Sequence, residues 1–496
     1  MNKPNVVLIM TDQQRFDSLS CYGNKAIQTP NLDLMAKEGV LFENCYVNCP
    51  ICTPSRSSIM TGKHMQDHGV YKVYDNLPKD EILFTKHLKD TGYKTALFGK
   101  LHVSSNHYEA EKRHPNDGFD IYEWCNESAL RMDSQYHGYK KWLLEKDPHF
   151  CRQLEKKKRS IGHIPPHLHM SFWAAEKAVE FINTSERDQP FFCKLSLFDP
   201  HDPYENYPEQ MEDKVDQSAI PAPIATDPKT DHIRGVDLER NHSYLGSFSD
   251  FSKKDIHKIR VGYNAAVAFI DEQIGKVTAA LEKKGISENT LIIFTSDHGD
   301  CLGDHGLMVK GAFFYDQAVK VPLIIKWPAQ LKPFKTKTLI QPHDIAATIL
   351  QAAGFGEDQL QSIMPDSKSL LSLAQDSTRT IHDFAVCCYR NSGINSSNSP
   401  WDPPVLGTML RSGNYKLNIY HEKTNDNYPK NGQLFNMEKD PSELNDLWDD
   451  PDSAQLKNEL LQQLTSWLAR REYKNLSSRG GNTPPQKSQR MTNKLK

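Results

Sequence analysis

The sequence predicts an α/β fold: a large, mainly parallel mixed sheet sandwiched by helices, with a smaller α+β subdomain after it. Apolar segments such as NVVLIM (5–10) and LIIF (291–294) are continuous rather than alternating, as expected for strands covered on both faces. Helical segments separate these strands, which favours crossover connections. Near residue 376 the pattern changes to short alternating segments and one long amphipathic helix, which indicates a separate α+β unit.

The elements follow one another in a regular order. Strands are expected at 5–10, 95–98, 191–198, 291–294 and 321–327. The segment 29–39 predicts a helix that Gly39 ends. A second helix is predicted before Gly285, because apolar residues there recur every three or four positions, at Val267, Ile270, Ile274, Val277 and Leu281.

Three units are expected along the chain: a large domain over 1–375, an α+β subdomain over 376–475 and a disordered tail over 476–496. Within the large domain, residues 103–190 are rich in His and Lys and are expected to be mostly helical, forming a cap. The polar, proline-containing stretch 202–255 is expected to be a loop over a cleft.

The composition excludes several classes of protein. The chain has 496 residues, 38% of them hydrophobic, and a net charge of −3, so we expect an ordered protein without general affinity for nucleic acid. No apolar run reaches the length of a membrane span. The ten cysteines are scattered, and VVLIM near the start is too short for a signal peptide. A cytoplasmic location is therefore expected, or a periplasmic or secreted one if a leader was removed.

Polar side chains follow four of the predicted strands. Sites in open α/β sheets form beyond the carboxyl ends of the strands, so we expect these side chains to meet at one rim of the sheet. The residues are Asp12 and Gln13 after the first strand, Lys100 and His102 after the second, His201 after the third, and Asp297 and His298 after the fourth.

Four of these residues have the chemistry of a metal site: Asp12, Gln13, Asp297 and His298. Carboxylate and amide oxygens suit Ca²⁺ or Mg²⁺, whereas an imidazole favours Mn²⁺ or Zn²⁺ somewhat. Aspartates after strands also commonly cap helices. Two such pairs at two strand ends favour the metal interpretation.

The stretch CYVNCPICTPSR (45–56) allows two interpretations. Its C-x3-C-x2-C spacing is typical of a radical-type iron–sulfur ligand set. Alternatively, Cys52 alone carries the chemistry, in the turn CTPSR, while Cys45 and Cys49 are small core residues.

Longer motifs decide between these interpretations. CTPSRSSIMTG (52–62) and GYKTALFGKLH (92–102) resemble the paired signatures of the sulfatases, a branch of the alkaline-phosphatase superfamily. The segment 296–325 resembles the metal-ligand and lysine region of that family, and 434–447 resembles its C-terminal segment. The resemblance spans roughly residues 4–470 and implies an alkaline-phosphatase-like fold over the large domain. The cysteine spacing is then a coincidence.

The resemblance implies a sulfuric ester hydrolase that depends on a modified cysteine. A maturation enzyme that reads C-x-P-S-R converts Cys52 to formylglycine, whose hydrate attacks sulfur and then expels sulfate. One divalent ion is implied, Ca²⁺ before Mg²⁺ or Mn²⁺, held by Asp12, Gln13, Asp297, His298 and the modified Cys52. Further roles are implied for Arg56 in holding the nucleophile and the carboxylates, for Lys100 and Lys310 as sulfate clamps, for His102 as base and for His201 as acid.

The chain departs from the family at two positions. Many sulfatases have a second aspartate where this chain has Gln13, and often Asn where it has His298. Relatives that cleave phosphonate monoesters and phosphodiesters also carry a D-Q start, so phosphoryl transfer is the alternative activity. A catalytically inactive, ester-binding relative is disfavoured, because neither the cysteine nor a metal ligand is lost. The His, Tyr, Asp and Lys content of 64–76, 103–170 and 202–255 favours a sulfated sugar over a steroid sulfate.

Overall fold

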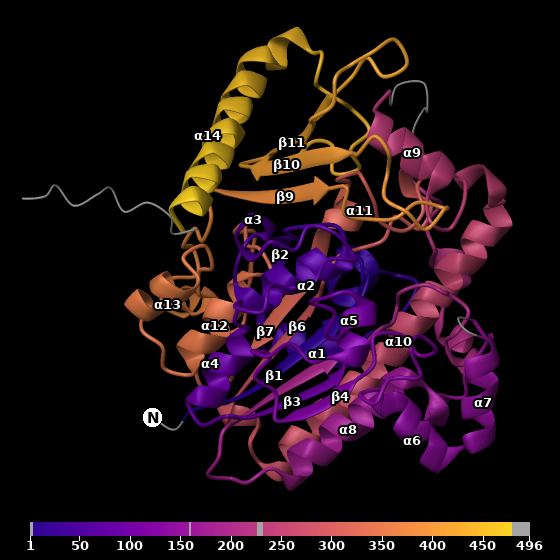
Figure 1. Ribbon diagram of the computed structural model, residues 1–496, viewed down its shortest axis with the longest axis vertical. Coiled ribbons are helices and arrows are strands. Elements are labelled where there is room, and N and C mark those ends of the chain that lie inside the picture. The colour runs from indigo at the N-terminus through magenta and orange to yellow at the C-terminus, as the bar shows by residue number, and fades with distance from the viewer. Residues whose placement is uncertain (1–2, 158–159, 226–231, 479–496) are drawn as a thin grey trace, which may run out of the picture.

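The computed structural model describes residues 3–157, 160–225 and 232–478 (Figure 1). Its main element is an eight-stranded sheet in the order β4-β3-β5-β1-β6-β7-β2-β8. The strands are β1 (Asn5–Thr11), β2 (Val40–Tyr46), β3 (Lys94–Gly99), β4 (Ile121–Trp124), β5 (Phe191–Ser196), β6 (Thr290–Ser296), β7 (Lys320–Lys326) and β8 (Phe334–Thr336).

The sheet is mixed but mainly parallel, as predicted. β1 pairs in parallel with both β5 and β6, and β3 pairs in parallel with β4 and β5. β7 runs antiparallel to its neighbours β6 and β2. Four parallel strands at the centre therefore direct their carboxyl ends to one rim, namely β3, β5, β1 and β6.

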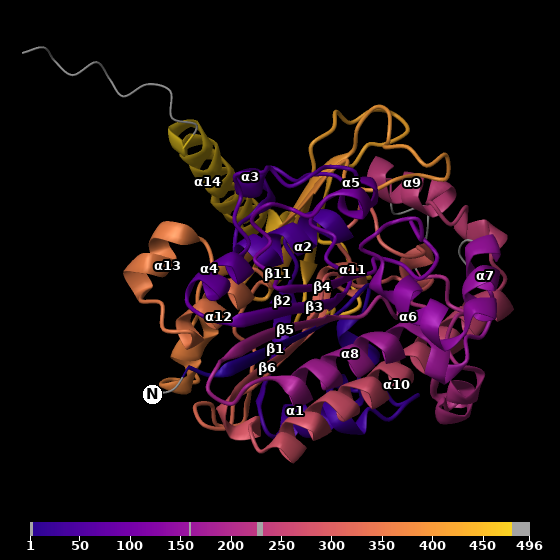
Figure 2. The ribbon, with the colours of Figure 1, turned by 60° about the horizontal axis from the view of Figure 1, so that its bottom comes forward.

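Each face of the sheet is covered by its own hydrophobic core. On β1, Val6 and Leu8 belong to one core, while Val7 and Ile9 belong to the other, as the twofold periodicity of a strand requires. Figure 2 shows the sheet between the two helical layers. One layer contains α2 (Cys52–Thr61), α4 (Phe84–Asp90) and α12 (Asp344–Ala352); the other contains α1 (Pro30–Lys37), α8 (Met170–Thr184) and α10 (Lys253–Lys284).

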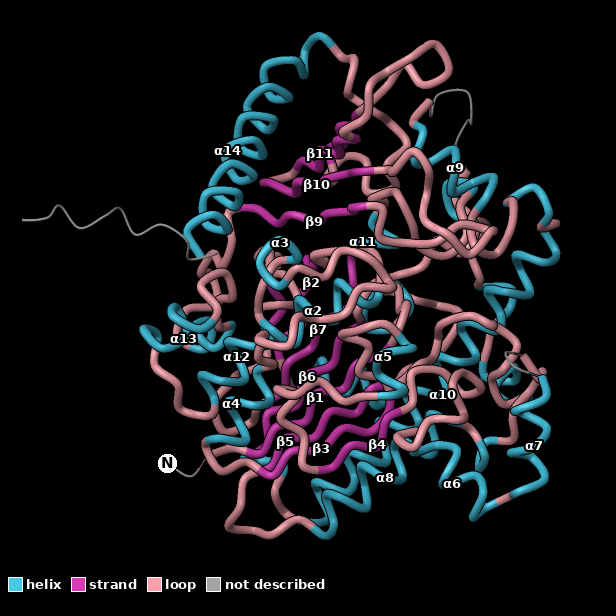
Figure 3. Tube along the Cα trace, viewed as in Figure 1, coloured by secondary structure: helices cyan, strands magenta, loops and turns pink. Residues whose placement is uncertain are grey.

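A smaller antiparallel sheet follows, in the order β12-β11-β10-β9, and α14 (Ala454–Ser478) lies alongside it (Figure 3). Its strands are β9 (Phe384–Arg390), β10 (Leu406–Ser412), β11 (Tyr415–Tyr420) and β12 (Gly432–Asn436). Leu460, Leu464 and Trp467 of α14 are buried. The helix extends three residues into the predicted tail, and residues 479–496 lie outside the described part. The boundary at 375/376 stays a prediction.

Two segments differ from expectation. Residues 103–190 are helical over only about half of their length, in α5 (Asn106–Glu111), α6 (Gly138–Lys146), α7 (Pro148–Lys157) and α8. Of these, α8 packs on β3 and β5 and so belongs to the layer that covers the sheet rather than to a cap. The predicted loop 202–255 contains a two-turn helix, α9 (Arg234–His242). Its sequence lacks an apolar stripe because its two apolar residues, Val236 and Leu238, lie two positions apart and so on different sides of the helix. Residues 226–231 of that loop lie outside the described part.

The remaining helices are short connections: α3 (Met65–His68), α11 (Asp316–Val319) and α13 (Glu357–Ile363). In the part of the chain that the structure describes, no helix combines the length and the apolar character needed to cross a membrane.

Candidate active site

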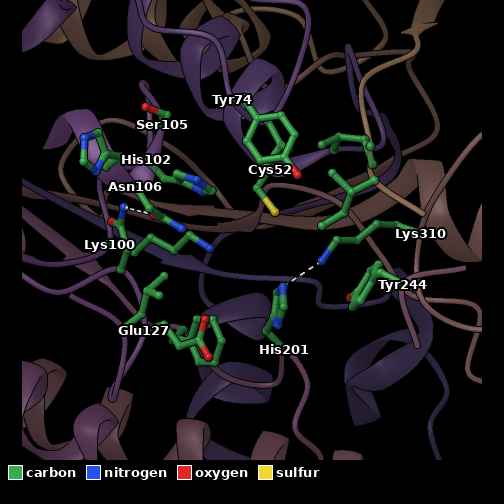
Figure 4. A pocket seen from close by; sticks show the side chains of 18 of the residues that line it. Cys52, Tyr74, Lys100, His102, Ser105, Asn106, Glu127, His201, Tyr244 and Lys310 are labelled. Carbon is green, nitrogen blue, oxygen red and sulfur yellow. Dashed lines mark hydrogen bonds between the residues drawn. The ribbon is translucent and has the colours of Figure 1, made fainter. Parts of the chain in front are cut away.

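The predicted site residues converge at the rim formed by the four central strands. Asp12 and Gln13 follow β1, Lys100 follows β3, and Asp297 follows β6. A cavity of about 620 Å³ opens above them, and its wall includes Cys52, Lys100, His102, His201 and Lys310. Figure 4 shows the Cys52 thiol between Lys100 and His102 on one side and Lys310 and Tyr244 on the other.

Cys52 is the first residue of α2, after the extended Ile51. Every residue of this helix is buried, so its N-terminal turn is held firmly under the cavity. The Cys52 Sγ lies 3.1 Å from Nε2 of His298 and 3.9 Å from Oδ1 of Asp12. The residue predicted to be the nucleophile thus lies directly beside two of the predicted metal ligands.

Arg56 joins the two carboxylates from one turn further along α2. Its Nε lies 2.5 Å from Oδ2 of Asp297, and its Nη2 lies 3.0 Å from Oδ2 of Asp12. The same guanidinium donates to Oγ of Ser196 at 3.0 Å. All of these side chains are buried. The planar fork of arginine can satisfy several acceptors at fixed angles, which a lysine cannot do.

Four side chains place one metal-binding atom each within 4.8 Å of one another: Asp12, Cys52, Asp297 and His298. His298 directs Nδ1 to the carbonyl of Gly299 at 3.0 Å, which leaves Nε2 facing the group. Two carboxylates and an imidazole fit a divalent cation. Among the described residues, the groups that could hold an ion include neither Cys45 nor Cys49. Cys45 and Cys49 are instead buried in the hydrophobic core on one face of the sheet, as the second interpretation of the cysteine spacing expects.

Gln13 follows Asp12 directly but contacts the Asp297 carboxylate through its backbone rather than through its side chain. Its backbone φ is 63°, and its backbone N–H donates to Oδ1 of Asp297 at 3.1 Å. Its side-chain oxygen accepts from Lys310, and its side-chain nitrogen donates to Oδ2 of Asp300 at 2.5 Å. Sequence reasoning missed Asp300, although it lies within the same SDHGD motif. Asp300 as acceptor and Lys310 as donor together fix which end of the Gln13 amide is the oxygen.

Two lysines approach the cavity from opposite sides. Nζ of Lys100 lies 2.7 Å from Oδ2 of Asp12 and 5.3 Å from the ring centroid of Phe198. Nζ of Lys310 lies 2.7 Å from Nε2 of His201 (Figure 4). Because both lysines are nearly buried, their charges are poorly screened by water. The arrangement favours an anionic group between them.

His102 is held by a residue that sequence reasoning missed. Its Nε2 lies 3.1 Å from Oγ1 of Thr53, and its backbone φ is 55°. The buried carboxylate of Glu109, on α5, accepts the backbone N–H of His102 at 2.9 Å. Four further donors reach the same carboxylate, namely the backbone N–H groups of Val103 and Ser104, Nε1 of Trp124 and Nδ2 of Asn126.

Charges within the site shift the pKa values of its groups. Burial alone would raise the pKa of Asp12, but Lys100 and Arg56 hold it well below its ordinary value. Burial would lower the pKa of Lys100, yet Asp12 raises it. Burial and the nearby Lys100 lower the pKa of His102, so its imidazole is neutral at neutral pH and can accept a proton.

Comparisons with known proteins agree with this geometry. A family model described as Sulfatase matches residues 4–355, and one described as N-sulphoglucosamine sulphohydrolase, C-terminal, matches residues 303–470. An arylsulfatase of Clostridium perfringens is 31% identical over 468 residues, covering 90% of each chain. An N-acetylglucosamine-6-O-sulfatase of Bacteroides thetaiotaomicron is 26% identical over 518 residues, covering 95% of this chain and 87% of that one.

Solved structures share the fold. A phosphonate monoester hydrolase of Agrobacterium radiobacter matches with a TM-score of 0.75 and 22% identity, covering 94% of this chain and 96% of that one. A structure in complex with its substrate D-glucosamine-2-N,6-O-disulfate matches with a TM-score of 0.71 and 22% identity, covering 95% and 98%. These neighbours establish the alkaline-phosphatase-like architecture predicted from the sequence.

Proposed function

The chain belongs to the sulfatase family and is a sulfuric ester hydrolase, and from this we propose that it releases inorganic sulfate from a sulfated carbohydrate through formylglycine at position 52. The observation that carries the proposal is the place of Cys52. Its side chain lies at the base of the cavity, beside His298 and near Asp12, with Lys100 and Lys310 lining the same space. The sulfate group of an ester, which is tetrahedral and carries one negative charge, fits between these cationic side chains.

Asp12, Gln13, Asp297 and His298 would hold one divalent ion, with Ca²⁺ preferred because oxygen donors dominate the set. When bound, this ion would lower the pKa of the nucleophile and offset the charge on the sulfate oxygens. Formylglycine at position 52, once hydrated, would supply one hydroxyl to displace the alcohol from sulfur and a second hydroxyl whose loss of a proton would re-form the aldehyde and break the carbon–oxygen bond to sulfate. Arg56 keeps the Asp12 and Asp297 carboxylates in place from below.

The other residues act on protons and charge. Lys100 and Lys310 hold the sulfate oxygens by charge-assisted hydrogen bonds, which strengthen as negative charge develops. His201, held through Nδ1 by the carbonyl of Asp202 at 2.8 Å, donates a proton to the leaving alcohol oxygen. His102, with its lowered pKa, removes the proton of the second hydroxyl.

A carbohydrate is proposed as the leaving group because several polar side chains line the cavity, beside apolar ones such as Val73 and Phe198. Ser105, Asn106, Asn126, Glu127 and Asn398 offer donors and acceptors suited to hydroxyl groups. The names of relatives that act on N-acetylglucosamine-6-O-sulfate and on ulvan point to the same class. A formylglycine-generating enzyme is the proposed partner in maturation.

Phosphonate monoester or phosphodiester hydrolysis is the second candidate activity, favoured by Gln13 and by the shared fold with phosphonate monoester hydrolases. One experiment separates the two. The metal-loaded protein, with formylglycine verified by mass, is assayed on sulfated mono- and oligosaccharides, an aryl sulfate, an aryl phosphate diester and a phenyl phosphonate. Sulfate release with the highest kcat/KM supports the proposal; faster cleavage of either phosphorus ester would overturn it.

A further inference from the structure

Glu239 is a buried acid in the cavity wall to which the proposed mechanism gives no role. It lies on α9, within the segment 202–255, and only 2% of its surface is exposed. The cavity wall also includes Lys310 and Tyr244 from neighbouring segments, and Ile51 and Ile394 supply apolar surface. An acid in such a place requires a reason, because burying a carboxyl group is costly.

The two oxygens of Glu239 have different surroundings. Oε1 accepts two hydrogen bonds, from the backbone N–H of Ala312 at 2.9 Å and from Nε1 of Trp401 at 3.2 Å. Oε2 makes no hydrogen bond to the residues that the structure describes, and no ion pair there involves Glu239. Since Oε1 is fully engaged, Oε2 is the atom left for a ligand in the cavity.

The close packing around this carboxyl group depends on two glycines. A Cβ on Gly311 would lie 2.2 Å from the carboxyl carbon of Glu239, and one on Gly235 would lie 2.8 Å from the carbonyl oxygen of Ala312. The absence of both side chains lets α9 approach the segment that follows Lys310. The acid is thereby held in one position beside a residue of the sulfate site.

Burial raises the pKa of Glu239 to about 8, although the N–H groups of Ala312 and Trp401 lower it in part. Tyr389 on β9 lies near enough to interact with Glu239 electrostatically, and the titratable groups Lys310 and Tyr244 line the same cavity. At neutral pH the carboxyl group is therefore largely protonated, and its hydroxyl can donate from Oε2.

We propose that Glu239 is a specificity residue that donates a hydrogen bond from Oε2 to a hydroxyl oxygen of the sugar that carries the sulfate. The inference rests on the proposed function and deepens it. A sugar oxygen suits this donor better than a ligand ammonium does, because Lys310 lines the same cavity and would repel a second cation.

The test is a double-mutant cycle between the protein and the substrate. The best substrate is first chosen from the 2-, 3-, 4- and 6-sulfates of glucose, galactose and their N-acetylamino forms, and its singly deoxygenated analogues are then prepared. Glu239→Ala, Glu239→Gln and the matched control Asp237→Ala are compared with the wild type. Asp237 lies on the same helix, and its carboxylate instead accepts the hydroxyl of Tyr428 at 2.9 Å.

We expect Glu239→Ala to lower kcat/KM about tenfold for the parent sugar sulfate. On the one deoxy analogue that lacks the hydroxyl contacted by Glu239, the same substitution should not lower kcat/KM further. Glu239→Gln should stay within about threefold of the wild type, because Oε1 must still accept both N–H groups and the amide nitrogen then donates from the place of Oε2. Asp237→Ala should keep the wild-type ratio of sugar sulfate to 4-nitrophenyl sulfate turnover.

Three results would contradict the inference while leaving the sulfatase function intact. The first is an equal loss of kcat/KM in Glu239→Ala on the sugar sulfate and on the aryl sulfate. The second is a loss of kcat/KM in Glu239→Gln as large as that in Glu239→Ala. The third is turnover of aryl sulfate without turnover of any sugar sulfate. Failure of the proposed function looks different: cleavage of the phosphonate with no sulfate ester hydrolysed.

Discussion

Nε of Arg56 lies 2.5 Å from Oδ2 of Asp297, and neither side chain is accessible to solvent. The same guanidinium also contacts Asp12, so one buried cation holds both carboxylates of the candidate metal site. Removing it leaves two buried negative charges close together, which is far more costly than breaking an exposed ion pair.

Arg56→Ala is therefore expected to lower the free energy of unfolding of the metal-free protein by about 3–5 kcal/mol. Arg56→Lys should recover part of that loss but not the activity, because an ammonium cannot bridge both carboxylates. Urea denaturation and sulfate release measure the two effects. The control Lys86→Ala breaks an exposed pair with Asp90 and should cost less than about 0.5 kcal/mol. Equal losses in Arg56→Ala and Lys86→Ala would contradict this prediction.

Metal content should depend on Asp297. Asp297→Asn is expected to lose the single divalent ion of the wild-type protein, since half of the carboxylate pair is neutralised. Elemental analysis of the folded variant measures this loss independently of turnover.

The control is Asp344→Asn, in the other described group that could hold a metal, with His343 and His382. There the Asp344 oxygens already accept from His382 and from backbone N–H groups, and His343 is bonded through both ring nitrogens. We expect Asp344→Asn to keep one ion per chain. Two ions in the wild type, or loss of the ion in Asp344→Asn alone, would place the metal elsewhere.

Glu109 is predicted to position His102. Its carboxylate accepts from three consecutive backbone N–H groups in the loop that carries this histidine. In Glu109→Gln an amide nitrogen must face N–H donors, so the loop shifts. We expect kcat to fall about tenfold to a hundredfold, with metal content and formylglycine unchanged. Glu111→Gln, at the exposed end of the same helix, is the control. An unchanged kcat and pH profile in Glu109→Gln would show that the contact has no catalytic consequence.

The fold and the site could be predicted from the sequence where an apolar strand is followed directly by a charged or metal-binding residue. The apolar strands end at Asp12, Lys100 and Asp297, and the parallel arrangement of the sheet brings these ends to one rim. Glu109 and Glu239 could not be found in this way. Their roles arise from contacts that form only in the folded chain: Glu109 on α5 contacts the loop just before that helix, and Glu239 on α9 contacts Ala312, 73 residues further along. No sequence periodicity marks such contacts.

The same limit applies to whole elements. β4 is only four residues long and partly exposed, so its sequence lacks the apolar run that marked the central strands. The predicted roles of the site residues remain proposals, although the structure brings the residues together. The sequence also did not predict the contacts of the Gln13 amide with Lys310 and Asp300.

The protein should lose stability in mild acid because a buried histidine is held neutral. Nδ1 of His137 accepts the backbone N–H of Lys140 at 3.1 Å, capping α6, and this ring is fully buried. Burial, with the nearby Lys140, lowers its pKa from 6.5 to about 4. The unfolded chain thus binds this proton at higher pH than the folded chain does, so stability is complete above pH 6.5 and falls between pH 6.5 and 4.

His137→Asn removes the titration while keeping a side chain that can cap the helix. Its free energy of unfolding should decrease less between pH 7 and pH 5 than that of the wild type, by about 1–2 kcal/mol. Urea denaturation at both pH values measures the difference, with the exposed His149→Asn as control. A pH dependence identical in wild type and His137→Asn would refute the assignment.

The central claim is that Cys52 acts only after conversion to formylglycine, since a thiol cannot offer two hydroxyls on one carbon. The most direct measurement is the mass of the peptide that spans residue 52, taken from preparations of graded activity. The account predicts that active protein is lighter by the difference between a CH₂SH and a CHO side chain, reacts with hydrazides, and releases sulfate in proportion to the converted fraction. Repeated turnover of a sulfate ester by protein whose Cys52 is unmodified by mass would contradict it.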